Sequence, residues 1–328
     1  METWLNWEGL LTNSQTISVD DTEVHHYDLG NGSPIVLLHG GGLASCSELN
    51  WGSVLGPLSD SCRVIALDQP GFGYTSPRGD QDCYPQHRAD FVAEFIQKKN
   101  LSNVTVVGNS RAGYQAAYLA LEYPELISKL VLVNAGSVSR KLMPGEIPGD
   151  LSSPKPTRES AAKSIEEMAD GYLLSPEKHP FWNGKITDEK IDWFYNLQRR
   201  NWEFTQLRND KIQQSAESLN SALSYKNKHI TEWHSSIQCP TLVTWSTRPY
   251  VGWPKSSPED NKSEPKLVTL RYQTLDSHKR DEGFDMGIRT FEKIPNAELH
   301  LWQNANHHLM TDHAERWSQV VKSFVSDS

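Results

Sequence analysis

Short apolar runs alternate with amphipathic stretches in two parts of the chain. Apolar runs bounded by turn residues are typical of strands in a buried sheet, whereas apolar positions repeating every three or four residues predict helices. The expected buried strands are 35–38, 63–67, 104–107, 130–133, 241–245 and 297–302. The expected helices are 47–58, 85–99, one that runs from the turn after strand 104–107 to Tyr123, and a last one over 312–325. This alternation predicts an α/β fold with a doubly wound, mostly parallel sheet, and 16–19 with 23–29 add an edge hairpin.

The pattern changes between residues 137 and 234. This stretch is charged, interrupted by prolines and helical in its periodicity, with aromatic residues scattered through it. Helices inserted after a central strand predict a lid over the carboxyl ends of the strands, where α/β folds bind ligands. We therefore expect a core of 1–136 and 235–328 with a helical cap or lid at 137–234.

Composition and charge exclude several classes of function. The net charge of −9 opposes binding to nucleic acid or to an anionic membrane. No apolar run is long enough to span a bilayer, and the first residues lack the features of a secretory signal. The four cysteines have no C-x-x-C spacing, which indicates free thiols and no zinc site. These features predict a cytoplasmic protein without a bound metal.

The stretch V-T-V-V-G-N-S-R-A-G, residues 104–113, carries the candidate chemistry. A β-branched run passes through a tight turn at Ser110 into an alanine-rich helix. Such a strand–turn–helix around G-x-S-x-G is the nucleophile elbow of α/β-hydrolases, although here Ala112 replaces the last glycine. A serine in this position needs a base within hydrogen-bonding reach and a third group that orients the base.

Further motifs extend this resemblance over about two-thirds of the chain. They are H-G-G-G at 39–42, R-V-I-A-L-D-Q-P-G-F-G at 63–73, V-G-N-S at 107–110, L-V-L-V-N-A-G at 130–136 and C-P-T-L-V-T-W at 239–245. In this order they resemble the α/β-hydrolase superfamily, and within it most closely the meta-cleavage-product hydrolases, which break carbon–carbon bonds.

The resemblance implies roles for several residues. Ser110 would be the nucleophile and His307, after the last strand, its base, with His308 as the adjacent competitor. The main-chain amides of Gly41 and Arg111 would form the oxyanion hole.

The remaining site residues are expected to contact the substrate. They are Asn50, Asn109, Gly42 and His308. Asn109 has an alternative role as a turn residue that tolerates an unusual backbone conformation.

The third member of the triad departs from the family pattern. The acid is expected at position 249, which is Pro249. The hydrophilic stretch 251–280 resembles an insertion, and setting it aside makes Asp281 the best candidate. Asp276 and Asp285 are alternatives, and Asn134 occupies the position where some superfamily members carry the acid.

The substrate-gripping arginine of the carbon–carbon hydrolases is also displaced. The register of the lid places Phe194 there, with Arg199 and Arg200 farther along. Arg111 is unusual after the nucleophile, where methionine is common. Its side chain would bind an anion, pair with a lid carboxylate or form a buried structural ion pair.

Two functional hypotheses follow. The first is a serine hydrolase of small organic molecules that acts on an ester, a lactone or the carbon–carbon bond of an activated ketone, without a cofactor. The second is a non-hydrolytic lyase, cyclase or ligand-binding protein on the same fold, motivated by the missing acid. A small-molecule substrate and a possible homodimer complete the expectations.

Overall fold

One sheet of eight strands forms the centre of the computed structural model, which describes residues 14–145, 154–169, 186–246, 285–303, 305 and 307–327. The strand order is β1-β2-β4-β3-β5-β6-β9-β10, with β1, β2 and β4 paired antiparallel and the remaining pairs parallel. The strands are β1 (Ser14–Val19), β2 (Thr22–Leu29), β3 (Ser33–Leu38), β4 (Cys62–Leu67), β5 (Val104–Asn109), β6 (Ile127–Val133), β9 (Thr241–Ser246) and β10 (Ala297–Trp302). The predicted mostly parallel, doubly wound sheet is confirmed.

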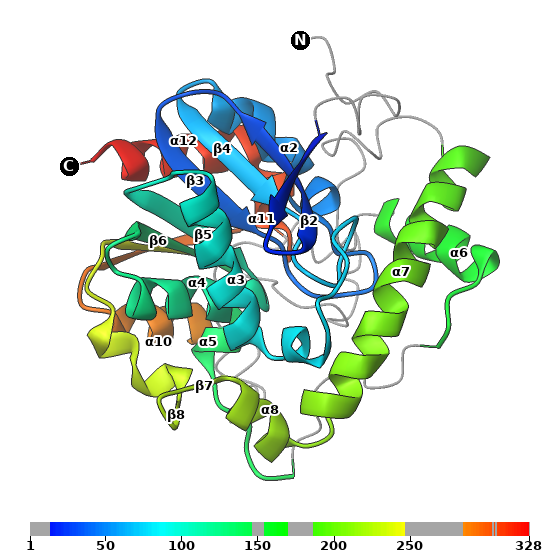
Figure 1. The fold of residues 1–328 in the computed structure, drawn as a ribbon. Helices are drawn as coiled ribbons and strands as arrows, with labels where there is room; N and C mark the ends of the chain where they lie inside the picture. The colour runs from blue at the N-terminus through cyan, green and yellow to red at the C-terminus, as the bar shows by residue number, and fades with distance from the viewer. Residues whose placement is uncertain are drawn as a thin grey trace, which may run out of the picture.

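Helices cover both faces of this sheet (Figure 1). The core helices and 3-10 turns are α2 (Ser47–Ser59), η1 (Asp80–Cys83), α3 (Pro85–Lys98), α4 (Ala112–Glu122), α5 (Gly136–Ser139), α10 (Asp285–Lys293), α11 (Leu309–Asp312) and α12 (Ala314–Ser326). One apolar cluster packs α3, α4 and α10 against one face, and a second packs α2, α11 and α12 against the other. Burial of apolar side chains on both faces explains why the central strands read as continuous apolar runs.

The expected edge hairpin is confirmed, whereas the expected last helix differs from the structure. The edge hairpin forms as β1 and β2 and turns at Asp20, whose φ is +50°. The expected last helix is divided, because α11 ends at Asp312 and α12 begins at Ala314 after His313 takes a non-helical conformation. The stretch 251–280 lies outside the described residues.

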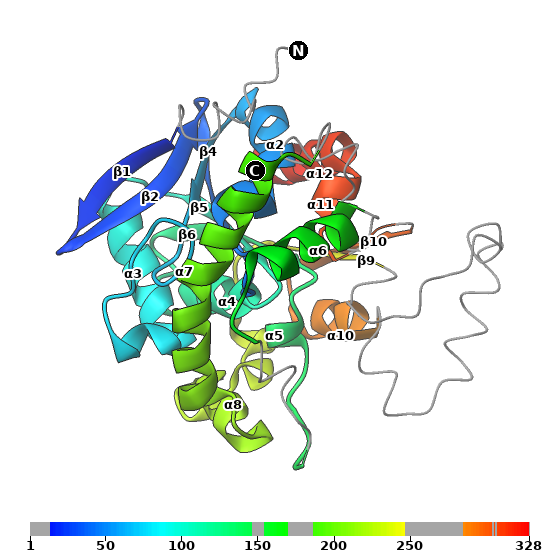
Figure 2. The ribbon, with the colours of Figure 1, turned by 90° about the vertical axis from the view of Figure 1, so that its right-hand side faces the viewer.

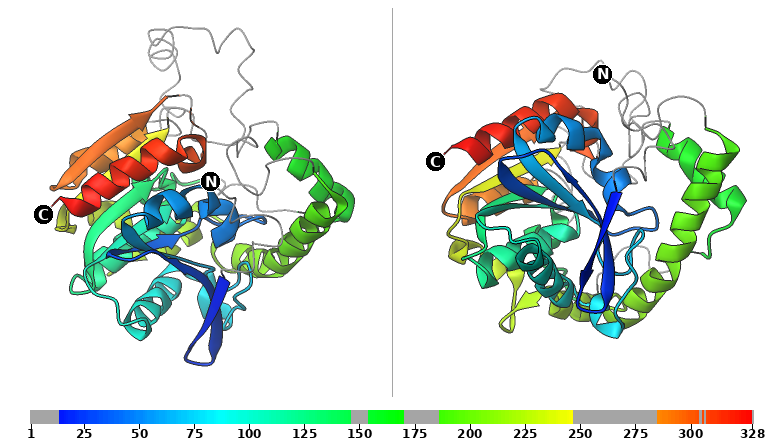
Figure 3. Two further views of the ribbon diagram at one scale, coloured as in Figure 1. Left: turned by 90° about the horizontal axis from the view of Figure 1, so that it is seen from above. Right: turned by 45° about the horizontal axis from the view of Figure 1, so that its top comes forward.

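A helical segment follows β6 and stands beside the sheet. Its helices are α6 (Arg158–Ala169), α7 (Asp188–Ile212) and α8 (Ala216–Ala222). Figure 2 shows α7 passing in front of the central strands, and Figure 3 shows α6 and α7 on one side of the molecule with the sheet on the other. Thr187 caps α7 by accepting a hydrogen bond from the Lys190 N–H.

The end of the expected lid packs against the core. The pieces there are the hairpin of β7 (Ser224–Tyr225) and β8 (Lys228–His229), and the short turns η2 (Ile230–Glu232) and η3 (His234–Ser236). Tyr225 and Ile230 belong to the same apolar cluster as α4, and the Tyr114 hydroxyl donates to the Ser224 carbonyl at 2.7 Å. The part of the expected lid that lies outside this apolar cluster is therefore α6 to α8.

Among the helices that the structure describes, none combines the length and the apolar character that crossing a membrane would require.

Candidate active site

Ser110 lies in a tight turn between β5 and α4. Its φ of +56° is in the left-handed region, which non-glycine residues rarely adopt and which marks backbone strain at functional sites. Small neighbours permit the turn, since a Cβ on Gly108 would lie 2.5 Å from the Ala112 carbonyl oxygen and one on Gly113 would lie 2.4 Å from the Ala135 Cβ. The predicted strand–turn–helix around this serine is thus present.

Two consecutive residues at the end of β6 hold Ser110 and His307 at one edge of the sheet. The Ser110 N–H donates to the Val133 carbonyl oxygen at 2.9 Å. The side-chain amide of Asn134 donates to the main-chain carbonyl oxygen of His307, also at 2.9 Å. The histidine loop after β10 is therefore fixed beside the serine turn, although nearly 200 residues separate them in sequence.

The glycine loop after β3, residues 39–42, lies beside the serine turn. His39 is buried and neutral, because its Nε2 accepts the Gln69 N–H at 3.0 Å while its Nδ1 donates to the Gly40 carbonyl at 2.7 Å. Burial lowers the pKa of His39, which makes it a structural residue of this loop. Asn50 accepts the Gly40 N–H through Oδ1 at 3.2 Å and so helps to set the path of the chain.

The main-chain amides of Gly41 and Arg111 face no acceptor. Neither N–H donates a hydrogen bond to any residue in the described ranges. A Cβ on the preceding Gly40 would lie 3.2 Å from the Ser110 Cβ, so the glycine loop approaches the serine closely. Both N–H groups are therefore available to an acceptor oxygen, as the predicted oxyanion hole requires.

The structure assigns contacts to two residues expected at the substrate. Asn109 is fully buried and donates through Nδ2 to the Val133 carbonyl at 3.1 Å, while its Oδ1 lies 3.4 Å from the position of a Cβ on Gly40. The Gly42 N–H donates to the Ser45 Oγ at 2.7 Å. That N–H is therefore occupied within the protein.

The acid that orients His307 is not among the contacts described. Asp281, Asp276 and Pro249 lie outside the described residues. Asp285 begins α10, and its carboxylate forms no hydrogen bond or ion pair within the described part of the chain. His308 stacks edge-on against His307, with 5.4 Å between the ring centroids.

The expected lid arginines lie on the exposed surface of α7. Phe194 is buried in an apolar cluster with Cys46 and Leu49, and Arg199 and Arg200 are exposed. Arg208, two turns beyond Arg200, is 3% exposed and lies beside the glycine loop.

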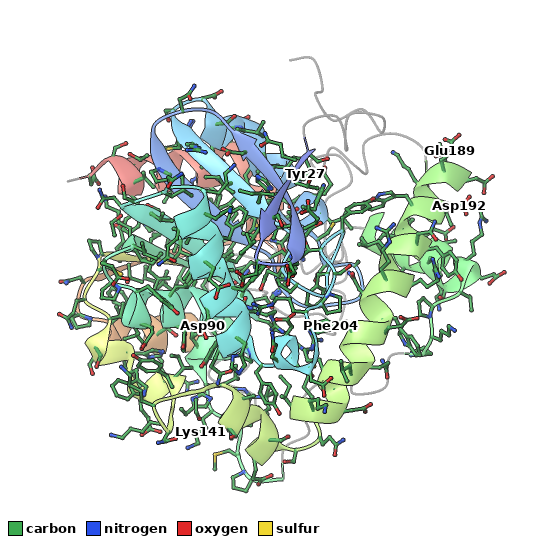
Figure 4. The ribbon with its side chains drawn as sticks, in the orientation of Figure 1. Tyr27, Asp90, Lys141, Glu189, Asp192 and Phe204 are labelled. Carbon is green, nitrogen blue, oxygen red and sulfur yellow. The ribbon has the colours of Figure 1, made fainter. Side chains whose placement is uncertain are left out.

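Sequence reasoning missed Arg208, although its spacing from Asn201 and Phe204 on one helix face was a usable signal. These three residues form the inner face of α7. Phe204 reaches from α7 to the core (Figure 4), with its ring centroid 5.4 Å from that of Phe72. Asn201 accepts the Gly73 N–H at 3.0 Å and donates to the Leu43 and Ser45 carbonyls.

A buried carboxylate organises the loops beneath α7. Asp68 accepts hydrogen bonds from the Ser47 N–H at 2.7 Å, the Tyr74 N–H at 3.0 Å and the His25 Nδ1 at 2.8 Å. Burial raises the pKa of Asp68, but the hydrogen bonds from His25 and Ser47 outweigh it and lower the pKa to about 2. Asp68 belongs to the motif R-V-I-A-L-D-Q-P-G-F-G, but the motif alone does not reveal this structural role.

Comparisons with known proteins agree with this geometry. A family model described as "alpha/beta hydrolase fold" matches residues 33–266. A 2-hydroxy-6-oxononadienedioate/2-hydroxy-6-oxononatrienedioate hydrolase from a Pseudomonas species is 24% identical, covering 95% of this chain and 96% of its own length. A 2-hydroxy-6-oxo-6-phenylhexa-2,4-dienoate hydrolase from Burkholderia cepacia is 23% identical over 93% of this chain and 91% of its own length.

A solved structure shows the same architecture. The meta-cleavage product hydrolase from Pseudomonas fluorescens IP01 superposes with a TM-score of 0.69 at 19% identity, covering 94% of this chain and 96% of that chain. The sheet order, the strained serine turn and the family match lead to one conclusion. This chain belongs to the α/β-hydrolase fold family.

Proposed function

We propose that this chain is a serine hydrolase that cleaves a carbon–carbon bond next to the ketone of a small carboxylic acid. The observation that carries the proposal is Ser110 at φ +56°, beside the unpaired N–H groups of Gly41 and Arg111. The substrates named for the two hydrolases above support the substrate class. They are of two types, a dienedioate with a carboxylate at each end and a phenyl dienoate with one.

The site would act through an acyl-enzyme. The Ser110 Oγ attacks the ketone carbon while His307 takes its proton, and the Gly41 and Arg111 amides bind the oxyanion. The carbon–carbon bond then breaks, its electron pair leaves with the conjugated fragment, and His307 returns the proton to that fragment. Water activated by His307 hydrolyses the acyl-enzyme and releases the second acid.

Asp281 is the acid that we propose for His307, and α6 to α8 are proposed as the lid. The support for Asp281 is its place in the sequence before α10, while that for the lid is the anchoring of α7 on the glycine loop through Asn201. Replacing Asp281 with Asn should lower kcat more than the same change at Asp276 or Asp285. An equal effect at all three positions would remove this assignment.

The test uses the purified protein and a dienedioate substrate, whose conjugated chromophore is lost on cleavage. Ser110→Ala and His307→Ala should each lower kcat by about a thousandfold or more. A fluorophosphonate should label wild-type Ser110 and fail to label the His307 variant at a comparable rate. Absence of both labelling and hydrolysis would favour the lyase, cyclase or ligand-binding alternative.

A cytoplasmic location is proposed as well. It is supported by the four free cysteines, of which Cys46, Cys62 and Cys83 are buried.

A further inference from the structure

Three arginines near the serine turn have no carboxylate partner within the described residues. Arg208 and Arg88 are 3% and 6% exposed, and the Nε of each has no hydrogen-bond acceptor. Arg88 donates through Nη1 to the main-chain carbonyl of Asp82, whose carboxylate is engaged by Arg78 at 2.6 Å. Among the described residues, the Arg111 side chain donates to the neutral side chain of Gln213, at 3.2 Å, and to no other. The pairing of Arg111 with a lid carboxylate is therefore absent from the described part of the chain.

Two of these arginines lie directly against the candidate oxyanion hole. A Cβ on Gly41 would fall 2.9 Å from the Arg111 Cδ and 3.1 Å from the Arg208 Nη1. The neighbouring Gly40 makes the corresponding approach to the Ser110 Cβ, at 3.2 Å. Two adjacent glycines of this loop thus lie against the nucleophile and against the arginine pair.

Few groups offset the charges in this cluster: the Asp82 carboxylate interacts with Arg88, and Arg208 lies over the Phe72 ring, 5.5 Å from its centroid. Burial lowers the pKa of Arg208 well below its ordinary value, and repulsion from Arg111 and Arg88 lowers it further. Arg111 is exposed, although the protein atoms around it lower its pKa by desolvation. The hydrogen bond to Gln213 at the end of α7 places the exposed Arg111 between α4 and α7.

Every unsatisfied buried group in the cluster is a donor. These groups are the Nε atoms of Arg88 and Arg208 and the Nε2 of Gln213, a residue that is 1% exposed. Guanidinium and amide donors arranged in this way match an anion with several acceptor oxygens, above all a planar carboxylate. Buried polar groups without partners are costly, so an anion that satisfies them gains affinity.

We propose that Arg111 and Arg208, with Arg88 behind them, bind a carboxylate of the substrate on a short arm from the carbonyl that Ser110 attacks. The proposal rests on the proposed hydrolase function and defines its substrate. Of the two substrate types considered above, the one with a carboxylate at each end fits, because its ketone side also carries a carboxylate. Arg111 and Arg208 are then specificity-determining residues.

The test compares two chromogenic esters that differ only in charge. One is p-nitrophenyl hemisuccinate, and the other carries an isopropyl group in place of the carboxylate. The wild-type protein should hydrolyse the anionic ester with a kcat/KM roughly tenfold or more above that of the neutral ester, after subtraction of the background rate. Arg208→Met and Arg111→Met should each remove this preference, since a charge-assisted hydrogen bond of this kind contributes roughly ten- to hundredfold.

Arg199→Met is the matched control, because Arg199 is an exposed arginine on the same helix. It should keep the full preference for the anionic ester. If Arg208→Met does not fold, Arg111→Met carries the same comparison. As a second measurement, succinate should raise the Tm of the wild-type protein and leave that of Arg111→Met unchanged.

The possible outcomes separate the two proposals. Hydrolysis of the neutral ester that depends on Ser110, with no preference for the anionic ester, would overturn the carboxylate site and leave the hydrolase function standing. A preference that persists in both arginine variants would overturn it as well. Stabilisation by chloride or phosphate equal to that by succinate, without an ester preference, would identify a solvent anion in place of the substrate. Absence of Ser110-dependent hydrolysis of either ester would count against the hydrolase function itself.

Discussion

The side chain of Asn134 joins the end of one strand to the loop that carries His307. Its Nδ2 donates to the His307 carbonyl at 2.9 Å, while its Oδ1 accepts the Ser246 N–H at 2.8 Å. The position requires a donor and an acceptor at once, which an amide supplies and an ionised carboxylate does not. This explains why an asparagine fits a site where some members of the superfamily carry the catalytic acid.

Replacing Asn134 with Asp should lower kcat by roughly tenfold or more with little change in KM. The variant keeps the acceptor for Ser246 but turns a second acceptor toward the His307 carbonyl, so the histidine loop loses its tie. Steady-state kinetics on the proposed substrate measures this. Asn103→Asp is the control, since Asn103 also has a positive φ but is exposed. A rise in activity for Asn134→Asp would show that this position can serve as the acid.

Asp68 should make the folded protein sensitive to acid. Its pKa is about 2 in the fold and about 3.8 in the unfolded chain, so between these values the unfolded chain binds more protons. The free energy of unfolding should therefore fall as the pH falls from about 4 toward 2, at up to about 1.4 kcal/mol per pH unit.

Urea unfolding at several acidic pH values measures this slope. Asp68→Asn should flatten it and should cost roughly 3 kcal/mol at pH 7, because His25 and the loop amides lose a buried anion. Asp60→Asn, at an exposed aspartate, should leave both quantities unchanged. An unaltered acid slope in Asp68→Asn would contradict the role given to this carboxylate.

Glu48 should give the free energy of unfolding a pH dependence of the opposite sign to that of Asp68. It is 3% exposed, and burial together with the charge of Asp68 raises its pKa to about 8. The folded protein then holds a proton that the unfolded chain releases above about pH 4.5, so the free energy of unfolding should fall as the pH rises from about 4.5 to 8.

Glu48→Gln should remove this dependence, because glutamine stays neutral and has a similar size. Urea unfolding at pH 5.5 and pH 8.5 tests this. The free energy of unfolding of the variant should exceed that of the wild-type protein only at the higher pH. Glu125→Gln changes an exposed glutamate and should show no such gain. Equal stability differences at both pH values would argue that Glu48 is ionised in the fold.

Asn201 should control how tightly α7 is held. It is fully buried, and Asn201→Ala leaves the Gly73 N–H and the Leu43 and Ser45 carbonyls without their partner. The expected cost is about 1–3 kcal/mol. Hydrogen exchange of α7 should accelerate and KM should rise, because the proposed lid loses its anchor.

The comparison variant is Asn196→Ala, at an exposed asparagine on the same helix. It should exchange at the wild-type rate over the rest of α7. If Asn201→Ala left both exchange and KM unchanged, the contacts at Leu43 and Ser45 would not be what holds this helix.

The sheet was predictable because its information is local. Apolar runs buried on both faces mark the central strands, and a β-branched run followed by Gly108 and Ser110 specifies a turn that only small neighbours permit. The order of these motifs sufficed to identify the fold and to select Ser110, His307 and Gly41 as candidates. Helical periodicity also indicated which residues share the inner face of α7.

The contacts between distant segments follow only from the tertiary structure. Helical periodicity predicts which residues share a face, but it does not say which loop that face meets, so the approach of Arg208 to Gly41 could not be read from the chain. The link from Asn134 to His307 likewise depends on how β6, β9 and the last loop converge at one edge of the sheet. The amino-acid sequence by itself determined the fold and the serine turn, because these depend on local pattern. Only the packing of the helical segment against the glycine loop placed the buried Arg208 beside Gly41, because that depends on the path of the chain through space.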